Sequence, residues 1–145
     1  MNVCWHIWKG TLLVAALMVL SVPPVLADFA SGRAAYERGN FHAAREEWEA
    51  LAKAGDAAAQ AALGGLYING EGVPIDYGEA VHWTRRAAEQ GEVTGQFNMG
   101  SIYAGGFGVE RDYGEAAHWF RLAAEQNDAI SRYTVLLYTS PSPRD

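Results

Sequence analysis

The sequence predicts an all-α fold in which antiparallel helix pairs stack into a repeat array. Residues 55–90 align with residues 91–126 without a gap and are identical at 19 of 36 positions, whereas chance gives roughly 2–3 matches. Each copy carries two stretches with apolar residues three and four apart, which is typical of amphipathic helices. A glycine-rich turn separates the two stretches. A fixed period between 20 and 50 residues indicates a stacked repeat architecture.

The signals that start and stop helices place two helices in each unit. Asp56, Asp76 and Asp112 stand where an N-cap side chain is needed. Gly91 stands where a helix-ending glycine belongs, and Asn127 takes its place in the next unit. The helices expected in chain order are 29–38, 41–54, 57–68, about 77–90, 93–104 and about 113–126.

The flanks of the two full units continue the repeat incompletely. Residues 28–54 align as a degenerate N-terminal capping repeat without the long turn. Residues 127–135 keep the register and are expected to start a further repeat. In 136–145, Leu136 and Thr139 replace the expected glycine and tyrosine. This segment resembles a translated sequencing adapter and is interpreted as an artefact, with a genuine proline-ended tail as the alternative.

Residues 1–27 have the pattern of a secretory signal peptide. A weakly basic start precedes an apolar run of about 11 residues, and small residues end at Ala27, where cleavage is expected. A membrane span needs about 20 residues, so an uncleaved anchor is the weaker alternative. The mature chain from Asp28 contains no cysteine, since Cys4 is the only one, and this excludes disulfides and a thiol nucleophile.

The charge of the expected mature chain limits the classes of partner that we expect it to bind. Removal of the leader removes one lysine and no acid, which leaves 10 basic and 17 acidic residues, or −7. An acidic surface of this size argues against binding to nucleic acid and to anionic membrane surfaces. We therefore expect no nucleic-acid partner, and no membrane association after cleavage.

The second helix of each unit is expected to bury one apolar stripe. In the first full unit this stripe holds Tyr77, Ala80, Trp83 or Thr84, and the alanines that follow. Gly64 and Gly100 lie inside the first helices, where glycine costs about 1 kcal/mol relative to alanine. We interpret both as points of close helix approach, so Gly64→Leu is expected to destabilise the fold.

The combined motif closely resembles the Sel-one-like repeat, a relative of the tetratricopeptide repeat with a longer turn between its helices. The motif runs Leu63-Gly64-x-x-Tyr67-x-x-Gly70-x-Gly72-Val73-x-x-Asp76-Tyr77-x-x-Ala80-x-x-Trp83-x-x-x-Ala87-Ala88-Glu89-Gln90-Gly91. The resemblance implies a right-handed α-solenoid whose first helices line a concave surface. It also implies an adaptor that assembles protein complexes, of a kind often exported in bacteria. A cysteine-rich subgroup associated with β-lactam binding has cysteines that this chain lacks.

No motif predicts catalysis, a cofactor or a metal site. Glu79-x-x-His82 and Glu115-x-x-His118 have the spacing of half a di-metal site. Equivalent positions in stacked helices lie about 10 Å apart, whereas bridged metals lie about 3.5–4 Å apart, so these residues are expected to be solvated. The glycines of 105–108 lack the flanking strand and lysine of a phosphate-binding loop.

The remaining candidate sites are polar and aromatic residues of the first helices, off the packing stripe. They are expected to face the concave groove and hold a peptide or protein partner, and they are Arg33, Glu37, Gln60, Asn69, Gln96, Asn98 and Tyr103. A solvated polar face, and simple packing of the tyrosine, are the alternatives that remain open.

Three functions are compatible with these features. The leading hypothesis is a non-enzymatic, exported scaffold, periplasmic or secreted, that mediates protein–protein or protein–peptide interaction. The second is the N-terminal repeat portion of a longer cell-envelope enzyme or enzyme subunit, for example one acting on peptidoglycan. The third, a structural or lipid-associated envelope component, fits the acidic charge less well.

Overall fold

The computed structural model describes residues 28–126. The expected leader 1–27, the expected repeat start 127–135 and the segment 136–145 lie outside the described residues. Within 28–126 the fold is all-α, as predicted, with six helices that end within one residue of the expected positions. They are α1 (Phe29–Glu37), α2 (Phe41–Lys53), α3 (Ala57–Asn69), α4 (Tyr77–Glu89), α5 (Val93–Gly105) and α6 (Tyr113–Glu125).

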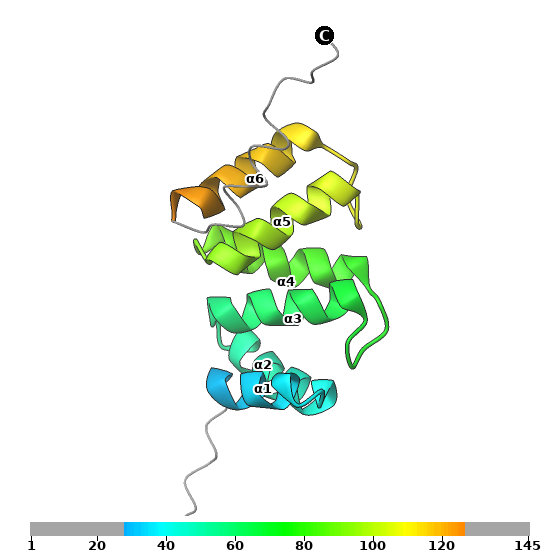
Figure 1. The fold of residues 1–145 in the computed structure, drawn as a ribbon, viewed down its shortest axis with the longest axis vertical. Coiled ribbons are helices and arrows are strands. Elements are labelled where there is room, and N and C mark those ends of the chain that lie inside the picture. The colour runs from blue at the N-terminus through cyan, green and yellow to red at the C-terminus, as the bar shows by residue number, and fades with distance from the viewer. Residues whose placement is uncertain (1–27, 127–145) are drawn as a thin grey trace, which may run out of the picture.

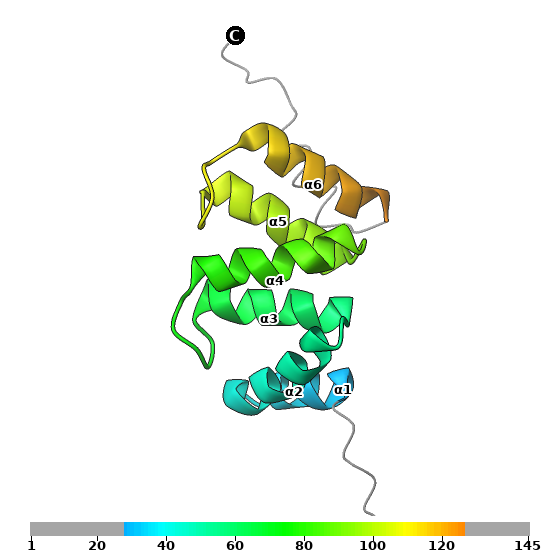
Figure 2. The same cartoon turned by 180° about the vertical axis from the view of Figure 1, so that it is seen from behind.

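The helices form three antiparallel pairs stacked along the long axis of the molecule (Figure 1). We call the odd-numbered helices the A layer and the even-numbered helices the B layer. In the A layer α3 contacts α5 directly, whereas α2 with α4, and α4 with α6, make at most isolated contacts. Between α3 and α5 the A layer is therefore more closely packed than the B layer. The pairs follow in the same order when the molecule is seen from behind (Figure 2).

The predicted N-caps are confirmed. Asp56 Oδ1 accepts a hydrogen bond from the Ala59 amide at 2.7 Å. Asp76 Oδ1 accepts from the amides of Gly78 and Glu79 at 2.9 and 3.0 Å. Asp112 caps α6 in the same way. Because these bonds satisfy amides that no helical carbonyl can reach, the sequence defines where α3, α4 and α6 begin.

Each glycine-rich turn packs on the unit before it. Gly72 lies against Phe41 at the start of α2, and Gly108 lies against Tyr77 at the start of α4; a Cβ added at either glycine would come within 2.8 Å of these residues. The Phe107 ring also stacks on Tyr77, with centroids 5.1 Å apart. Tyr77 is nevertheless 38% exposed rather than buried in the α4 stripe, so that part of the predicted stripe was wrong. It provides a surface on which the next turn rests.

The rest of the α4 stripe is buried as expected, namely Ala80, Trp83, Thr84, Ala87 and Ala88.

Close helix approach at Gly64 and Gly100 is confirmed. A Cβ at Gly64 would collide with the Thr84 hydroxyl, and one at Gly100 would lie 2.6 Å from the Phe120 ring. Thr84 and Phe120 occupy equivalent positions on α4 and α6, so each unit uses the same glycine to bring its two helices together. This explains why a residue unfavourable in a helix interior recurs at this position.

Within residues 28–126, no helix has the length and apolar character needed to cross a membrane.

Candidate functional site

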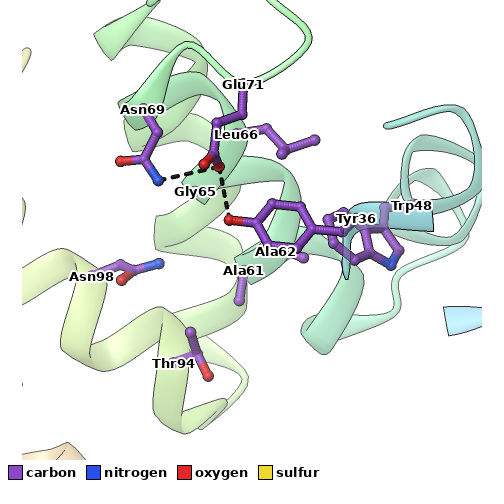
Figure 3. Close-up of a pocket in the computed structure, with 10 residues that line it drawn as sticks. All are labelled: Tyr36, Trp48, Ala61, Ala62, Gly65, Leu66, Asn69, Glu71, Thr94 and Asn98. Atoms are coloured by element: carbon purple, nitrogen blue, oxygen red, sulfur yellow. Dashed lines mark hydrogen bonds between the residues drawn. The ribbon is translucent and has the colours of Figure 1, made fainter. Parts of the chain in front are cut away.

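A pocket of about 160 Å³ opens on the A layer, where α1, α3 and α5 present side chains to a common space (Figure 3). The turn after α3 and one tryptophan of α2 complete its wall. The lining residues are Tyr36, Trp48, Ala61, Ala62, Gly65, Leu66, Asn69, Glu71, Thr94 and Asn98. The pocket exists because α1 and α3 make at most isolated contacts with each other, whereas α3 and α5 are packed together.

The floor of the pocket is one face of α3 made mostly of small side chains. Ala61, Ala62, Gly65 and Leu66 recur at helical spacing along this face. A Cβ added at Gly65 would meet no atom within 4 Å. Gly65 therefore differs from its neighbour Gly64, which is needed for helix contact, because the space above Gly65 is the pocket itself.

A carboxylate lies at the rim. Tyr36 Oη donates a hydrogen bond to Glu71 Oε2 at 3.0 Å, and Asn69 Nδ2 donates to the same oxygen at 3.3 Å. Burial and the bond to Glu71 raise the pKa of the Tyr36 hydroxyl, so it remains a donor at neutral pH. Glu71 is the only charged residue among those that line the pocket.

Thr94 and Asn98 face the floor from α5, one helical turn apart (Figure 3). With Asn69 they place two side-chain amides and a hydroxyl around an apolar floor. An amide donates and accepts hydrogen bonds, so these groups match the alternating N–H and C=O groups of an extended peptide.

The structure separates the seven predicted site residues into four groups. Asn69 and Asn98 line the pocket. Arg33 and Glu37 are exposed on α1 and pair with each other, with 3.0 Å between Arg33 Nε and Glu37 Oε1. Tyr103 is half-buried, and its hydroxyl accepts a hydrogen bond from Arg85 Nη2 at 3.3 Å.

Gln60 and Gln96 do not face the groove, which corrects the expectation for both. Gln60 is fully buried, where its Nε2 donates to the Ala52 carbonyl at 3.0 Å and its Oε1 accepts from Gln90 Nε2 at 2.7 Å. Gln96 is 6% exposed and accepts from Gln126 Nε2 at 2.9 Å. Gln60 thus joins polar groups of α2 and α4, and Gln96 is buried with its oxygen bonded to Gln126, so neither side chain is presented to a partner.

The family now follows from comparison with known proteins. The sequence profile of the Sel1 repeat, which is the Sel-one-like repeat, matches residues 57–92 and 93–128. This chain belongs to the Sel1 repeat family. Sel1 repeat proteins typically act as scaffolds for protein–protein interaction and are generally non-catalytic. No protein of curated function matches the chain.

Solved structures similar to this Sel1 repeat protein include the following two. A Sel1 repeat protein from Oxalobacter formigenes has 32% identity and a TM-score of 0.70, over 80% of this chain and 51% of its own. The protein c5321, described as a protective antigen present in uropathogenic Escherichia coli strains and displaying an SLR fold, has 39% identity and a TM-score of 0.65, over 71% of this chain. This chain spans 23% of the length of c5321 and about half that of the Oxalobacter protein.

Sequence reasoning missed most of the pocket of this Sel1 repeat protein. Tyr36, Trp48, Glu71 and Thr94 were not predicted as site residues, nor was the small-residue floor. A signal for the floor exists in the difference between the two copies. Where α5 carries Phe97, Asn98 and Ser101, the equivalent positions of α3 carry alanine, alanine and glycine. Because these residues are small, they leave a recess on this face of α3 that bulkier side chains at the same positions would fill.

The polar groups of the pocket lining are hydroxyls, amides, the indole of Trp48 and one carboxylate, and the lining contains no histidine, cysteine or lysine. In the described part of the chain, no group of three or more histidine, cysteine, aspartate or glutamate residues is arranged to hold a metal ion. Glu79 and His82 are both exposed, and Glu79 Oε2 accepts from Trp83 Nε1 at 3.0 Å.

Proposed function

We propose that this Sel1 repeat protein is an exported, non-enzymatic scaffold that binds a segment of another protein on its A layer. The pocket is the observation that carries the proposal. Pockets for drug-sized ligands and cofactors occupy about 300–1,000 Å³, whereas this one has about 160 Å³ and is bordered by amides. That size suits one side chain of a peptide whose backbone lies along α3 and α5.

The distribution of differences between the two copies supports the A layer as the binding side. The copies differ at 17 of 36 positions, since 19 are identical; 14 of these differences lie in 55–75, and 3 lie in 76–90. Residues 76–90 and their equivalents form the B layer, which the repeat holds nearly constant. A scaffold needs a constant packing layer, but a surface that recognises a particular partner differs from unit to unit.

The proposed location rests on the sequence of the leader. Residues 1–27 have the three regions of a secretory signal peptide, and cleavage after Ala27 would release a chain of charge −7. The protein would then act in the periplasm or outside the cell. Its acidic surface favours a protein partner over nucleic acid.

A capture experiment tests the binding role. Wild type, Gly65→Leu and Ala50→Leu are each produced as the full chain, cross-linked in the exported fraction and affinity-purified. Gly65→Leu adds a side chain that enters the pocket from a Cβ with no atom within 4 Å, whereas Ala50→Leu places the same side chain on the exposed surface of α2. We expect partners shared by wild type and Ala50→Leu to be lost from Gly65→Leu. Identical partners for all three proteins would contradict binding at the pocket.

Amino-terminal sequencing of the exported protein tests the location. A first residue of Asp28 is expected, and retention of the full-length chain in the cytoplasm would contradict export.

A further inference from the structure

We infer that the pocket selects a partner segment with an aliphatic side chain close to a lysine or arginine, the aliphatic group filling the α3 floor and the cation pairing with Glu71. This inference rests on the proposed function and specifies which protein segments the A layer accepts.

The floor determines the aliphatic part of the segment. Trp48, Leu66 and the alanines of α3 present apolar carbon atoms to a bound side chain. No side chain of the α3 floor can form a hydrogen bond. A polar side chain seated there would lose its water without a replacement, which is unfavourable. A branched aliphatic side chain would instead replace water over the small residues of α3.

Glu71 determines the cationic part. Tyr36 and Asn69 both donate to Glu71 Oε2, so the carboxylate is fixed in orientation while its other oxygen keeps its capacity to accept. No lysine or arginine lines the pocket, and Arg33, on α1, is paired with Glu37. The carboxylate is therefore without a cation from the lining, and a cation on the ligand would form a charge-assisted hydrogen bond with it.

The second copy shows that the repeat itself does not need a carboxylate here. The residue equivalent to Glu71 is Phe107, whose ring stacks on Tyr77 of the preceding unit. An aromatic contact thus serves to hold the turn. The first copy places a half-buried acid in this position, beside the pocket, where it faces Tyr36 instead. The net charge of −7 expected after cleavage acts in the same direction, because it attracts basic segments over longer distances.

Peptide selection tests which segments bind. A random 12-residue phage-displayed library is selected on the full chain and depleted on the full-length Gly65→Leu variant. We expect enriched peptides to carry valine, leucine or isoleucine within about three residues of a lysine or arginine, a distance set by side chains on neighbouring positions of an extended strand. Enrichment of acidic or uncharged peptides would overturn the inference and leave the proposed function standing. Failure to enrich any peptide that Gly65→Leu rejects would contradict both.

The role of Glu71 is tested with one enriched peptide and two matched variants. Glu71→Gln keeps the shape and the acceptor for Tyr36 but removes the charge, while Glu37→Gln removes an exposed acid of α1 outside the pocket. We expect Glu71→Gln to weaken binding about tenfold at low salt, as for loss of a charge-assisted bond. Glu37→Gln should change binding by less than about twofold, as for an exposed charge.

Replacing the basic residue of the peptide by glutamine completes a double-mutant cycle. If Glu71 and that residue pair, the two changes are not additive. Additive losses, or equal effects of Glu71→Gln and Glu37→Gln, would overturn the pairing while the Gly65→Leu result still reports on the proposed function. Concentration-dependent self-association that Gly65→Leu abolishes would show that a second copy fills the pocket, which also overturns the inference.

Discussion

Gly64 and Gly65 are adjacent in α3, yet the structure predicts opposite responses to the same substitution. At Gly64, a Cβ would meet the Thr84 hydroxyl and lie 3.2 Å from the Thr84 amide nitrogen and 3.3 Å from the Ala80 carbonyl oxygen. The hydroxyl can rotate, but the other two atoms belong to the α4 backbone. Gly64→Ala therefore forces α3 and α4 apart by a few tenths of an ångström.

The magnitudes follow from two opposing contributions. Replacing a helical glycine by alanine stabilises the helix by about 1 kcal/mol at either position. Overpacking between helices costs about 1–3 kcal/mol and applies only to Gly64. We therefore expect Gly65→Ala to stabilise the protein by up to about 1 kcal/mol, and Gly64→Ala to lie about 1–3 kcal/mol below it. For a domain of this size, 1 kcal/mol corresponds to about 4–8 °C in Tm.

Thermal unfolding followed by circular dichroism at 222 nm measures both variants against wild type. The expected order of Tm is Gly65→Ala, then wild type, with Gly64→Ala at or below wild type. Equal shifts of the two variants in the same direction would refute the reasoning, because they would show that an added methyl group at Gly64 does not disturb the packing of α3 on α4. A loss of stability in Gly65→Ala would refute the statement that the space above it is open.

Three further changes test other parts of the fold. Thr84→Val should raise the free energy of unfolding measured in urea by about 1 kcal/mol. The buried Thr84 hydroxyl has no hydrogen-bond partner within residues 28–126, and the substitution removes this unsatisfied group. Gln60→Leu should destabilise by about 1–3 kcal/mol in urea unfolding, because it removes two buried hydrogen bonds, one to the Ala52 carbonyl and one from the Gln90 amide. The hydrogen bond from Lys53 lowers the pKa of Glu49 below its usual 4.5, and this effect is larger than the opposing effect of burial. The stabilisation of the fold by ionised Glu49 is therefore present above pH 4.5 and is lost as pH falls. The Tm of Glu49→Gln should consequently fall less than that of wild type between pH 6 and 3; equal slopes would contradict this.

The sequence predicted the helices because their ends are encoded locally. Asp56, Asp76 and Asp112 cap helices through side chains only two or three residues from the amides they satisfy. Gly70 and Gly106 end helices with φ of +72°, a conformation that glycine adopts without strain. Such signals do not depend on tertiary contacts, so a pattern along the chain is sufficient to place α3 to α6.

The pocket was not predictable in the same way, because it depends on how α1 sits relative to α3. The first unit has a nine-residue α1 and a short turn, and nothing in its sequence specifies that α1 packs mainly on α2 rather than on α3. Tyr36 reaches Glu71 across 35 positions of sequence. A contact of this kind follows from the packing of units and not from periodicity.

The error at Gln60 and Gln96 shows how a repeat can be used to separate packing from recognition. These two glutamines are identical between the copies, and both are buried in hydrogen bonds that join helices. Asn69 and Glu71, by contrast, become glycine and phenylalanine in the second copy, and both lie on the pocket. A polar residue repeated at every unit meets a need that every unit shares, which is internal. A polar residue found in one unit alone meets no such need, and on a stacked scaffold the surface that contacts a partner is where such a residue can be used.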